Sequence, residues 1–156
     1  MHAEKIFFTE ELLTRISFWR TTGDVIVFTN GCFDILHPGH VHLLHFCRQH
    51  GDRVIVGLNS DASVRRLKGD KRPLNHEKSR ATVLAALLYT DAIVLFDDDT
   101  PEALIREIKP DVLVKGGDWK PHEVAGAQFV KSYGGRVEIA PYLEGYSTTS
   151  ILAKIQ

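Results

Sequence analysis

Two histidines three positions apart are the residues of this sequence whose types and spacing point most clearly to chemistry. His37 and His40 belong to a His-Pro-Gly-His tetrapeptide that follows the loop of residues 29–34. Proline suits the first turn of a helix, and the intervening glycine keeps side-chain bulk away from a bound group. Imidazoles at a helix N-terminus can donate hydrogen bonds to phosphate oxygens, and the helix dipole favours the negative charge. The segment therefore predicts a phosphate-binding site.

Histidines at a helix start can also serve as caps, surface residues or metal ligands. The order of strand, TNGCFD loop, HPGH and helix favours phosphate binding over these alternatives. Gly31 lets the backbone turn and approach a ligand, so that the N–H groups of Cys32 and Phe33 can point at phosphate oxygens. The sequence has no Gly-x-Gly and no Gly-Lys, so this loop is neither a dinucleotide fingerprint nor a P-loop.

The elements that must position this site alternate between strand-like apolar runs and segments of helical period. Strands are expected at residues 25–28, 54–58, 92–96, 112–114 and 136–140, and helices at residues 9–19, 41–51, 62–67, 78–89, 104–108, 123–132 and from the 145–149 loop to 156. This alternation predicts the α/β class: one Rossmann-like, doubly wound domain with a five-stranded parallel sheet and helices on both faces. The loops that follow the first, second, fourth and fifth of these strands are then expected to converge on one crevice.

Size and composition agree with a single domain. The chain has 156 residues, of which 44% are hydrophobic and 25% charged, enough for one well-buried core. We expect residues 1–22 to form an N-terminal helical extension, whose Trp19 could serve dimerisation, and residues 25–156 to form the core.

Charge and cysteine content narrow the partners. The chain has 19 basic and 20 acidic residues and a net charge of −1, which is no electrostatic footprint for nucleic acid or for an acidic membrane. Its two cysteines, Cys32 and Cys47, form no CxxC pair, which favours a reduced compartment over a disulfide framework. No apolar run approaches the roughly 18–20 residues of a membrane span. We expect a cytoplasmic protein with neither a nucleic acid nor a membrane as partner.

The segment GCFDILHPGH resembles the (T/C)FDxxHxGH motif of the nucleotidyltransferase superfamily that includes the glycerol-3-phosphate and phosphocholine cytidylyltransferases. The segment GYSTTSIL, near the end of the chain, is similar to the closing Gly-x-Ser-(S/T)-(S/T)-x-Ile motif of that group. Together with KGGDW at residues 115–119, it makes the chain resemble the heptose-1-phosphate adenylyltransferases of ADP-heptose synthesis. The resemblance extends from about residue 25 to residue 155.

The resemblance implies transfer of a nucleoside monophosphate, AMP from ATP, to D-glycero-D-manno-heptose 1-phosphate, with release of pyrophosphate. It implies Mg²⁺ held mainly by the nucleotide phosphates, without a metal site in the protein. Dimerisation is common in the resembled enzymes, so we expect a homodimer. The resembled enzyme is often fused to a sugar kinase, for which 156 residues leave no room, so we expect a separate kinase to supply the substrate. Three alternatives remain open: a cytidylyl- or guanylyltransferase acting on another phosphorylated sugar or alcohol, a non-catalytic nucleotide-binding module, and a metal-binding protein.

The resemblance also assigns residues. The catalytic residues are His37, His40 and Lys68. The nucleotide- and phosphate-binding residues are Thr29, Asn30, Gly31, Cys32, Phe33, Asp34, Gly39, Arg72, Gly116, Asp118, Tyr146, Ser147, Thr148 and Thr149. The substrate-binding residues are Asn59, Asp61, Arg80, Gly117 and Trp119.

Several of these assignments have structural alternatives. The basic loop around Lys68 and Arg72 could be a solvated charge run, Arg80 an ordinary salt-bridge residue, and Ser147 a helix cap. Asp61 could likewise cap its helix, and the Gly116–Trp119 segment could be a tight turn. The cytidylyltransferases carry Arg-Thr-Glu-Gly before the closing motif, whereas this sequence has Tyr-Leu-Glu-Gly at residues 142–145. The missing arginine weakens a cytidylyltransferase assignment, and one positive charge must come from elsewhere.

Overall fold

A computed structural model describes residues 2–155. Its strands are β1 (Ile6–Phe7), β2 (Ile26–Gly31), β3 (Arg53–Asn59), β4 (Ala92–Phe96), β5 (Val112–Gly116) and β6 (Arg136–Ala140). Its α-helices are α1 (Thr9–Thr21), α2 (Pro38–His50), α3 (Asp61–Lys68), α4 (Glu77–Ala85), α5 (Glu102–Ile108), α6 (Ala127–Ser132) and α7 (Thr148–Ile155). Short 3₁₀ helices, η1 (His2–Lys5) and η2 (Pro121–Glu123), complete the described elements.

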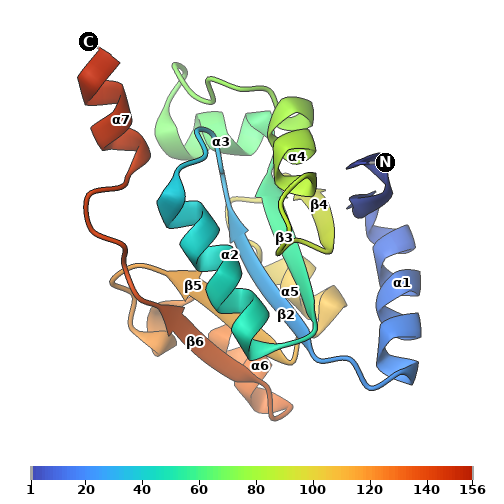
Figure 1. Cartoon of the computed structure of the whole chain (residues 1–156). Helices are drawn as coiled ribbons and strands as arrows, with labels where there is room; N and C mark the ends of the chain where they lie inside the picture. The colour runs from blue at the N-terminus through green and yellow to red at the C-terminus, as the bar shows by residue number, and fades with distance from the viewer. Residues whose placement is uncertain (1, 156) are drawn as a thin grey trace.

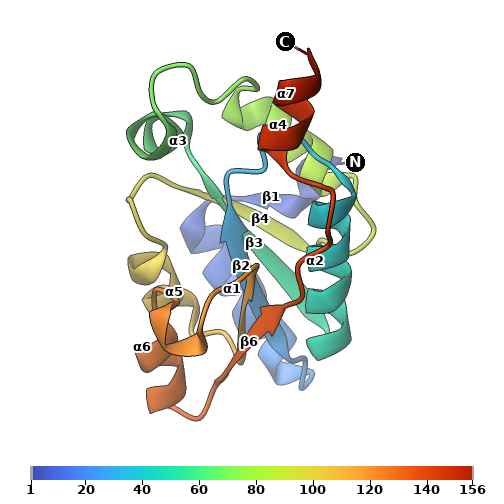
Figure 2. The same ribbon diagram turned by 90° about the vertical axis from the view of Figure 1, so that its left-hand side faces the viewer.

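The strands form one parallel sheet in the order β1-β4-β3-β2-β5-β6, with helices on both of its faces (Figures 1 and 2). On one face α1, α5 and α6 pack against the sheet, and on the other face α2 and α4 do so. The central strands are apolar on both sides, as a parallel sheet covered by helices requires. The predicted α/β class and the two helical layers are confirmed.

The predicted number of strands is wrong, because the sheet has six strands rather than five. The additional strand, β1, is two residues long and pairs with β4 through Ile6 and Phe7. A two-residue strand is too short to show any alternation in sequence. The α1 helix packs on the same domain through Leu12, Ile16 and Trp19, and Trp19 is only 6% exposed.

The helix expected at residues 123–132 is also interrupted. The chain forms η2 first and begins α6 only at Ala127. Gly126, the residue before α6, has φ +82°, a left-handed conformation that breaks a helix. A Cβ at this position would lie 2.9 Å from the Ile105 side chain, so glycine here also lets the chain approach α5.

The order of the strands places a switch point at the centre of the sheet. From β2 the chain moves outward to β3 and β4, then crosses to β5 on the other side of β2. Doubly wound sheets bind ligands beyond the carboxyl ends of the strands at such a reversal. HPGH follows β2, so the histidine pair lies at this position.

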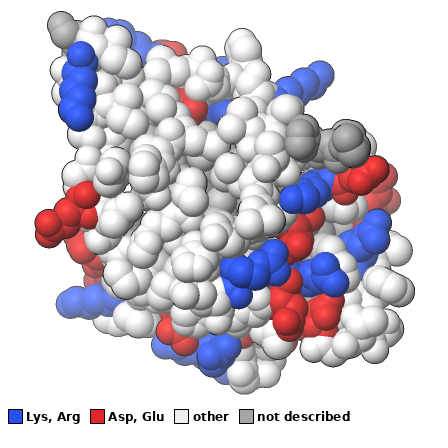
Figure 3. Space-filling model, viewed as in Figure 1, with Lys and Arg blue, Asp and Glu red and all other residues white. Residues whose placement is uncertain are grey.

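Within the described residues, the helices are all too short or too polar to cross a membrane. Figure 3 shows the face over α2 and α4, where the centre has few charged side chains and the lysines, arginines and acids lie around the margin. This face shows no continuous basic stripe of the kind that follows a nucleic-acid backbone.

Candidate active site

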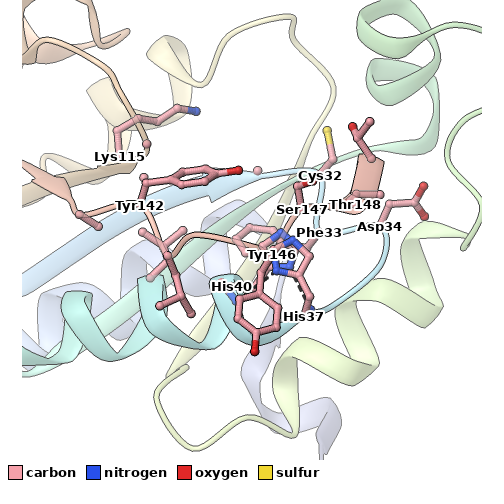
Figure 4. Close-up of a pocket in the computed structure, with 18 of the residues that line it drawn as sticks. Cys32, Phe33, Asp34, His37, His40, Lys115, Tyr142, Tyr146, Ser147 and Thr148 are labelled. Atoms are coloured by element: carbon pink, nitrogen blue, oxygen red, sulfur yellow. Dashed lines mark hydrogen bonds between the residues drawn. The ribbon is translucent and has the colours of Figure 1, made fainter. Parts of the chain in front are cut away.

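A cavity of about 370 Å³ opens at the switch point, within the size range of small-molecule sites. It is lined from the loops after β2, β5 and β6, the end of α3 and the starts of α2 and α7 (Figure 4). Of the residues predicted from sequence, it brings together Asn30, Gly31, Cys32, Phe33, Asp34, His37, Gly39, His40, Lys68, Gly116, Gly117, Tyr146, Ser147, Thr148 and Thr149. Two segments more than a hundred residues apart in sequence thus face one cavity.

The histidine pair forms the cap of α2. His37 is the N-cap residue, and its Nδ1 accepts a hydrogen bond from the N–H of Gly39 at 3.1 Å. In return, Nδ1 of His40 accepts from the N–H of His37 at 3.4 Å. The two rings stack with centroids 3.9 Å apart. The capping alternative and the phosphate-binding prediction are therefore compatible, because capping uses only one nitrogen of each ring.

Glycine is needed at two positions around these rings. A Cβ on Gly39 would lie 2.8 Å from Cε1 of His37, so only glycine lets that ring fold back against the helix start. A Cβ on Gly31 would lie 2.9 Å from the ring of Phe33. Phe33 itself has φ +47°, an uncommon conformation for a residue with a side chain. The loop is thus shaped around the aromatic ring that contacts His40, at a centroid distance of 5.0 Å.

The hydrogen bonds fix the tautomer of both imidazoles. Because Nδ1 is an acceptor in His37 and in His40, each neutral ring carries its proton on Nε2. Burial lowers the pKa of His40 to about 4, and the charges of His37 and Lys68 act in the same direction. Burial also lowers the pKa of His37. At neutral pH the pair therefore supplies two uncharged N–H donors.

This lowered pKa predicts a pH dependence of stability. An unfolded histidine titrates near 6.5, whereas native His40 stays neutral down to about pH 4. Between these values the unfolded chain binds a proton that the native chain does not, so the free energy of unfolding should fall as the pH falls from 6.5 to 4. Urea denaturation at pH 7.5 and 5.0 measures this loss.

In this experiment, His40→Ala should show a smaller loss between the two pH values than the wild-type protein. His45→Ala is the matched control, since His45 is exposed on the same helix and should keep the wild-type pH dependence. An unchanged pH dependence in His40→Ala would contradict the assignment.

Asp34 connects the loop between β2 and α2 (residues 32–37, called here the phosphate loop) to the segment before α4. Its carboxylate is 4% exposed and accepts hydrogen bonds from the N–H groups of Leu74 and Asn75 and from Nε of Arg72, at 2.7 Å. Burial alone would raise the pKa of Asp34, but these donors outweigh it and lower the pKa. Arg72 is therefore engaged with Asp34 and is not among the residues that line the cavity.

Arg80, on α4, forms a second buried cluster behind the same loop. It is 2% exposed and donates to the carbonyl oxygens of Cys32, Asn59 and Asn75 and to the carboxylate of Asp61. The structure places Asn59, Asp61 and Arg80 in this cluster, outside the cavity lining. The geometry favours the salt-bridge alternative for Arg80.

The start of α7 forms the other wall of the cavity. The Oγ of Ser147 accepts from the N–H of Ser150 at 3.0 Å, so Ser147 is a helix cap. Ser147, Thr148 and Thr149 also line the cavity, as the phosphate-binding prediction requires. Gly145, with φ +85°, makes the turn that brings this helix start over the site. α7 itself has no buried residue.

The remaining predicted residues lie around the cavity without lining it. Thr29 is fully buried within β2, while Asp118 and Trp119 are exposed beyond Gly117. Six further residues line the cavity without having been predicted from the sequence: Leu43, Lys115, Ala140, Pro141, Tyr142 and Leu143. A lysine that directly follows a buried apolar run, as Lys115 follows VLV, was the available signal for a functional group at a strand end.

The cavity offers little to hold a metal directly. Within residues 2–155, no three His, Cys, Asp or Glu side chains are grouped so as to hold an ion. The one carboxylate in the cavity lining, that of Asp34, is already paired with Arg72. The cavity lining therefore fits a magnesium ion that is coordinated mainly by the phosphates of a bound nucleotide and by few protein ligands.

The chain is similar to several known proteins. A family model described as Cytidylyltransferase-like matches residues 28–154. Relatives named Bifunctional protein HldE come from Geotalea uraniireducens (57% identity over 137 residues, 88% of this chain and 28% of the relative), Rhodopseudomonas palustris BisA53 (56% over 146 residues, 94% and 30%) and Methylobacillus flagellatus (50% over 153 residues, 98% and 31%). The chain thus spans less than a third of the length of these relatives.

A solved structure is also similar to this chain. The crystal structure of the lipopolysaccharide core biosynthesis protein from Thermoplasma volcanium GSS1 aligns with a TM-score of 0.62 and 29% identity, covering 80% of this chain and all of that one. The matched region of the family model runs from β2 through α7 and contains both walls of the cavity. The resemblance predicted from the two motifs is confirmed, and the chain belongs to the cytidylyltransferase-like family.

Proposed function

We propose that this chain transfers AMP from ATP to D-glycero-D-manno-heptose 1-phosphate, forming ADP-heptose for surface-glycan synthesis. The observation that carries the proposal is the histidine pair, held as two neutral Nε2–H donors at the N-terminus of α2 in a cavity at the switch point. The choice of adenine and heptose rests on the GGDW and GYSTT segments and on the HldE relatives.

The reaction needs positioning rather than a protein nucleophile. An oxygen of the sugar phosphate attacks the α-phosphorus of ATP, and the bond from that phosphorus to the bridging oxygen breaks, so that pyrophosphate leaves. Enzymes accelerate such transfers by aligning the groups and by stabilising the charge on the phosphoryl oxygens. Preorganised N–H donors are suited to this, because they need no proton transfer of their own.

Each wall of the cavity has a role in this scheme. His37 and His40 donate to the triphosphate and to the oxygens of the transferring phosphoryl group. Lys68, at the end of α3, and the Ser147–Thr149 helix start bind the outer phosphates. Magnesium, bound with the nucleotide, would neutralise further phosphate charge.

The adjoining loop supplies the pocket for base and sugar. Gly116 and Gly117 line the cavity, and a base can approach their backbone closely. Trp119 is 47% exposed just outside the lining, where it can stack on a bound ring when the loop closes over the substrate.

The relatives are named bifunctional and are more than three times as long as the region that they share with this chain. We propose that a sugar kinase makes the sugar phosphate on which this chain acts, that the reaction takes place in the cytoplasm, and that the chain works as a homodimer.

Pyrophosphate release across ATP, CTP and GTP, each with the heptose 1-phosphate, tests the function. We expect turnover with ATP at least tenfold above that with CTP or GTP. Turnover with CTP alone would favour the cytidylyltransferase alternative that the family description suggests. Nucleotide binding without product for any of the three would instead indicate a non-catalytic module. A denatured preparation serves as the blank.

A further inference from the structure

Lys115 enters the cavity from the sheet. It is the penultimate residue of β5, where it pairs in register with Ile139 of β6. The chain continues from β6 through Pro141 to Tyr142, and Figure 4 draws Tyr142 and Lys115 at the same end of the cavity. Lys115 therefore occupies the carboxyl edge of the sheet, where ligands of doubly wound domains bind.

Its ammonium group has no anionic partner among residues 2–155. Among these residues it forms no salt bridge and no side-chain hydrogen bond, and its Nζ lies 5.6 Å from the centroid of the Trp119 ring. The one carboxylate in the cavity lining, that of Asp34, is held by Arg72. A partly buried cation without a counter-charge is costly to the fold, so its presence indicates a ligand that supplies the charge.

The surroundings of Lys115 add positive charge. Burial lowers the pKa of Lys115, Cys32 acts in the opposite direction, and the charge of Lys68 lowers it further. Lys68 and Lys115 thus both line the cavity that contains the neutral histidine pair. Such a field attracts a group with more than one negative charge.

We propose that Lys115 binds a phosphate group of a substrate from the β5 side of the cavity, so that with Lys68 it balances the phosphate charge that the neutral histidines cannot. The proposal rests on the proposed function only in that the ligand is a phosphate compound. Both the triphosphate and the sugar phosphate carry that chemistry, and they are separated by testing each alone.

The test compares Lys115→Met with Lys131→Met, which removes an exposed lysine on α6. Calorimetric binding is measured with inorganic tripolyphosphate and, separately, with D-glycero-D-manno-heptose 1-phosphate. We expect Lys115→Met to weaken one of the two by at least tenfold, and the ligand affected identifies the source. Lys131→Met should bind both within twofold of wild type, and Lys115→Arg should recover part of the loss. Wild-type affinity of Lys115→Met for both ligands overturns the proposal.

Thermal unfolding separates binding from a structural role. Without ligand, Lys115→Met should unfold at the wild-type temperature or above it, because an unpaired buried charge is removed. With saturating ligand of the affected kind it should gain less than the wild-type protein does. If Lys115→Met does not fold, Lys115→Gln replaces it, and failure of both to fold would assign Lys115 to the structure and overturn the proposal.

These measurements are independent of the nucleotide panel. Tripolyphosphate has neither base nor sugar, and binding needs no turnover. Loss of binding in Lys115→Met alongside no product from ATP would leave the inference standing and remove the proposed function. Efficient turnover with ATP, with wild-type binding in Lys115→Met, would do the reverse.

Discussion

Replacing His40 with alanine is expected to lower kcat/KM by about 100- to 1000-fold, the range found when one preorganised donor to a developing oxyanion is removed. The ring of His40 is fixed by three contacts: Nδ1 accepts from the His37 backbone, its face stacks on His37, and Phe33 lies against it. Its Nε2–H is therefore aimed before substrate binds, and an alanine leaves neither the donor nor a replacement. Steady-state pyrophosphate release measures the loss.

The matched control is His45→Ala, on the same helix but exposed beside Tyr89. It should retain turnover within about twofold. His37→Ala should resemble His40→Ala, because it removes a donor and also leaves the N–H of Gly39 without its partner. If His40→Ala keeps activity within about tenfold of wild type, equivalent to about 1.4 kcal/mol, the phosphate-clamp role is wrong.

The pH profile distinguishes a neutral donor from a charged one. With the pKa of His40 lowered to about 4, its protonation state does not change between pH 5.5 and 8. Between pH 5.5 and 8, the pH profiles of activity for the wild-type protein and for the His40→Ala variant should therefore have the same shape. An inflection near 6.5 that the variant lacks would show that the imidazole titrates and contributes as a cation.

The structural features that could be predicted from the sequence are those that depend on neighbouring residues. The HPGH cap and the serine cap of α7 each follow from residues within a few positions of one another, and the structure contains both. Gly31 instead ends β2, and the unusual backbone conformation of this loop lies at Phe33, with φ +47°. The alternation of strands and helices likewise predicts the layers and the crevice, since parallel strands need crossovers.

The features that could not be predicted from the sequence depend on contacts between residues that are far apart in the chain. The partner of Arg72 is Asp34, and Lys115 lies beside Trp119 without forming a salt bridge to any acidic residue among those that the structure describes. No spacing in the chain reveals either fact. The strand β1 was missed for a similar reason, as two apolar residues become a strand only when the edge of β4 is available to pair with them.

The largest effect on stability is expected at Arg80, a residue with two competing assignments. Arg80→Met should lower the free energy of unfolding by about 3–5 kcal/mol, the usual cost of removing one member of a buried, hydrogen-bonded ion pair. Arg80 is 2% exposed, and its loss would remove a donor from the carbonyls of Cys32 and Asn59 and the cationic partner of the Asp61 carboxylate, which would keep the N–H of Glu77. Urea denaturation at pH 7.5 measures it.

Arg106→Met is the control for this experiment, since Arg106 forms an exposed pair with Glu102 on α5 and should change stability by less than about 1 kcal/mol. Because Arg80 donates to Cys32 at 2.7 Å, its loss should also loosen the phosphate loop and weaken tripolyphosphate binding. A substrate-binding arginine would behave differently: Arg80→Met would keep wild-type stability and raise only the KM for the sugar phosphate. The four contacts of Arg80 join three segments, namely the loop after β2, the β3–α3 junction and the segment before α4. They predict the first result, in which one buried side chain holds the phosphate loop in place.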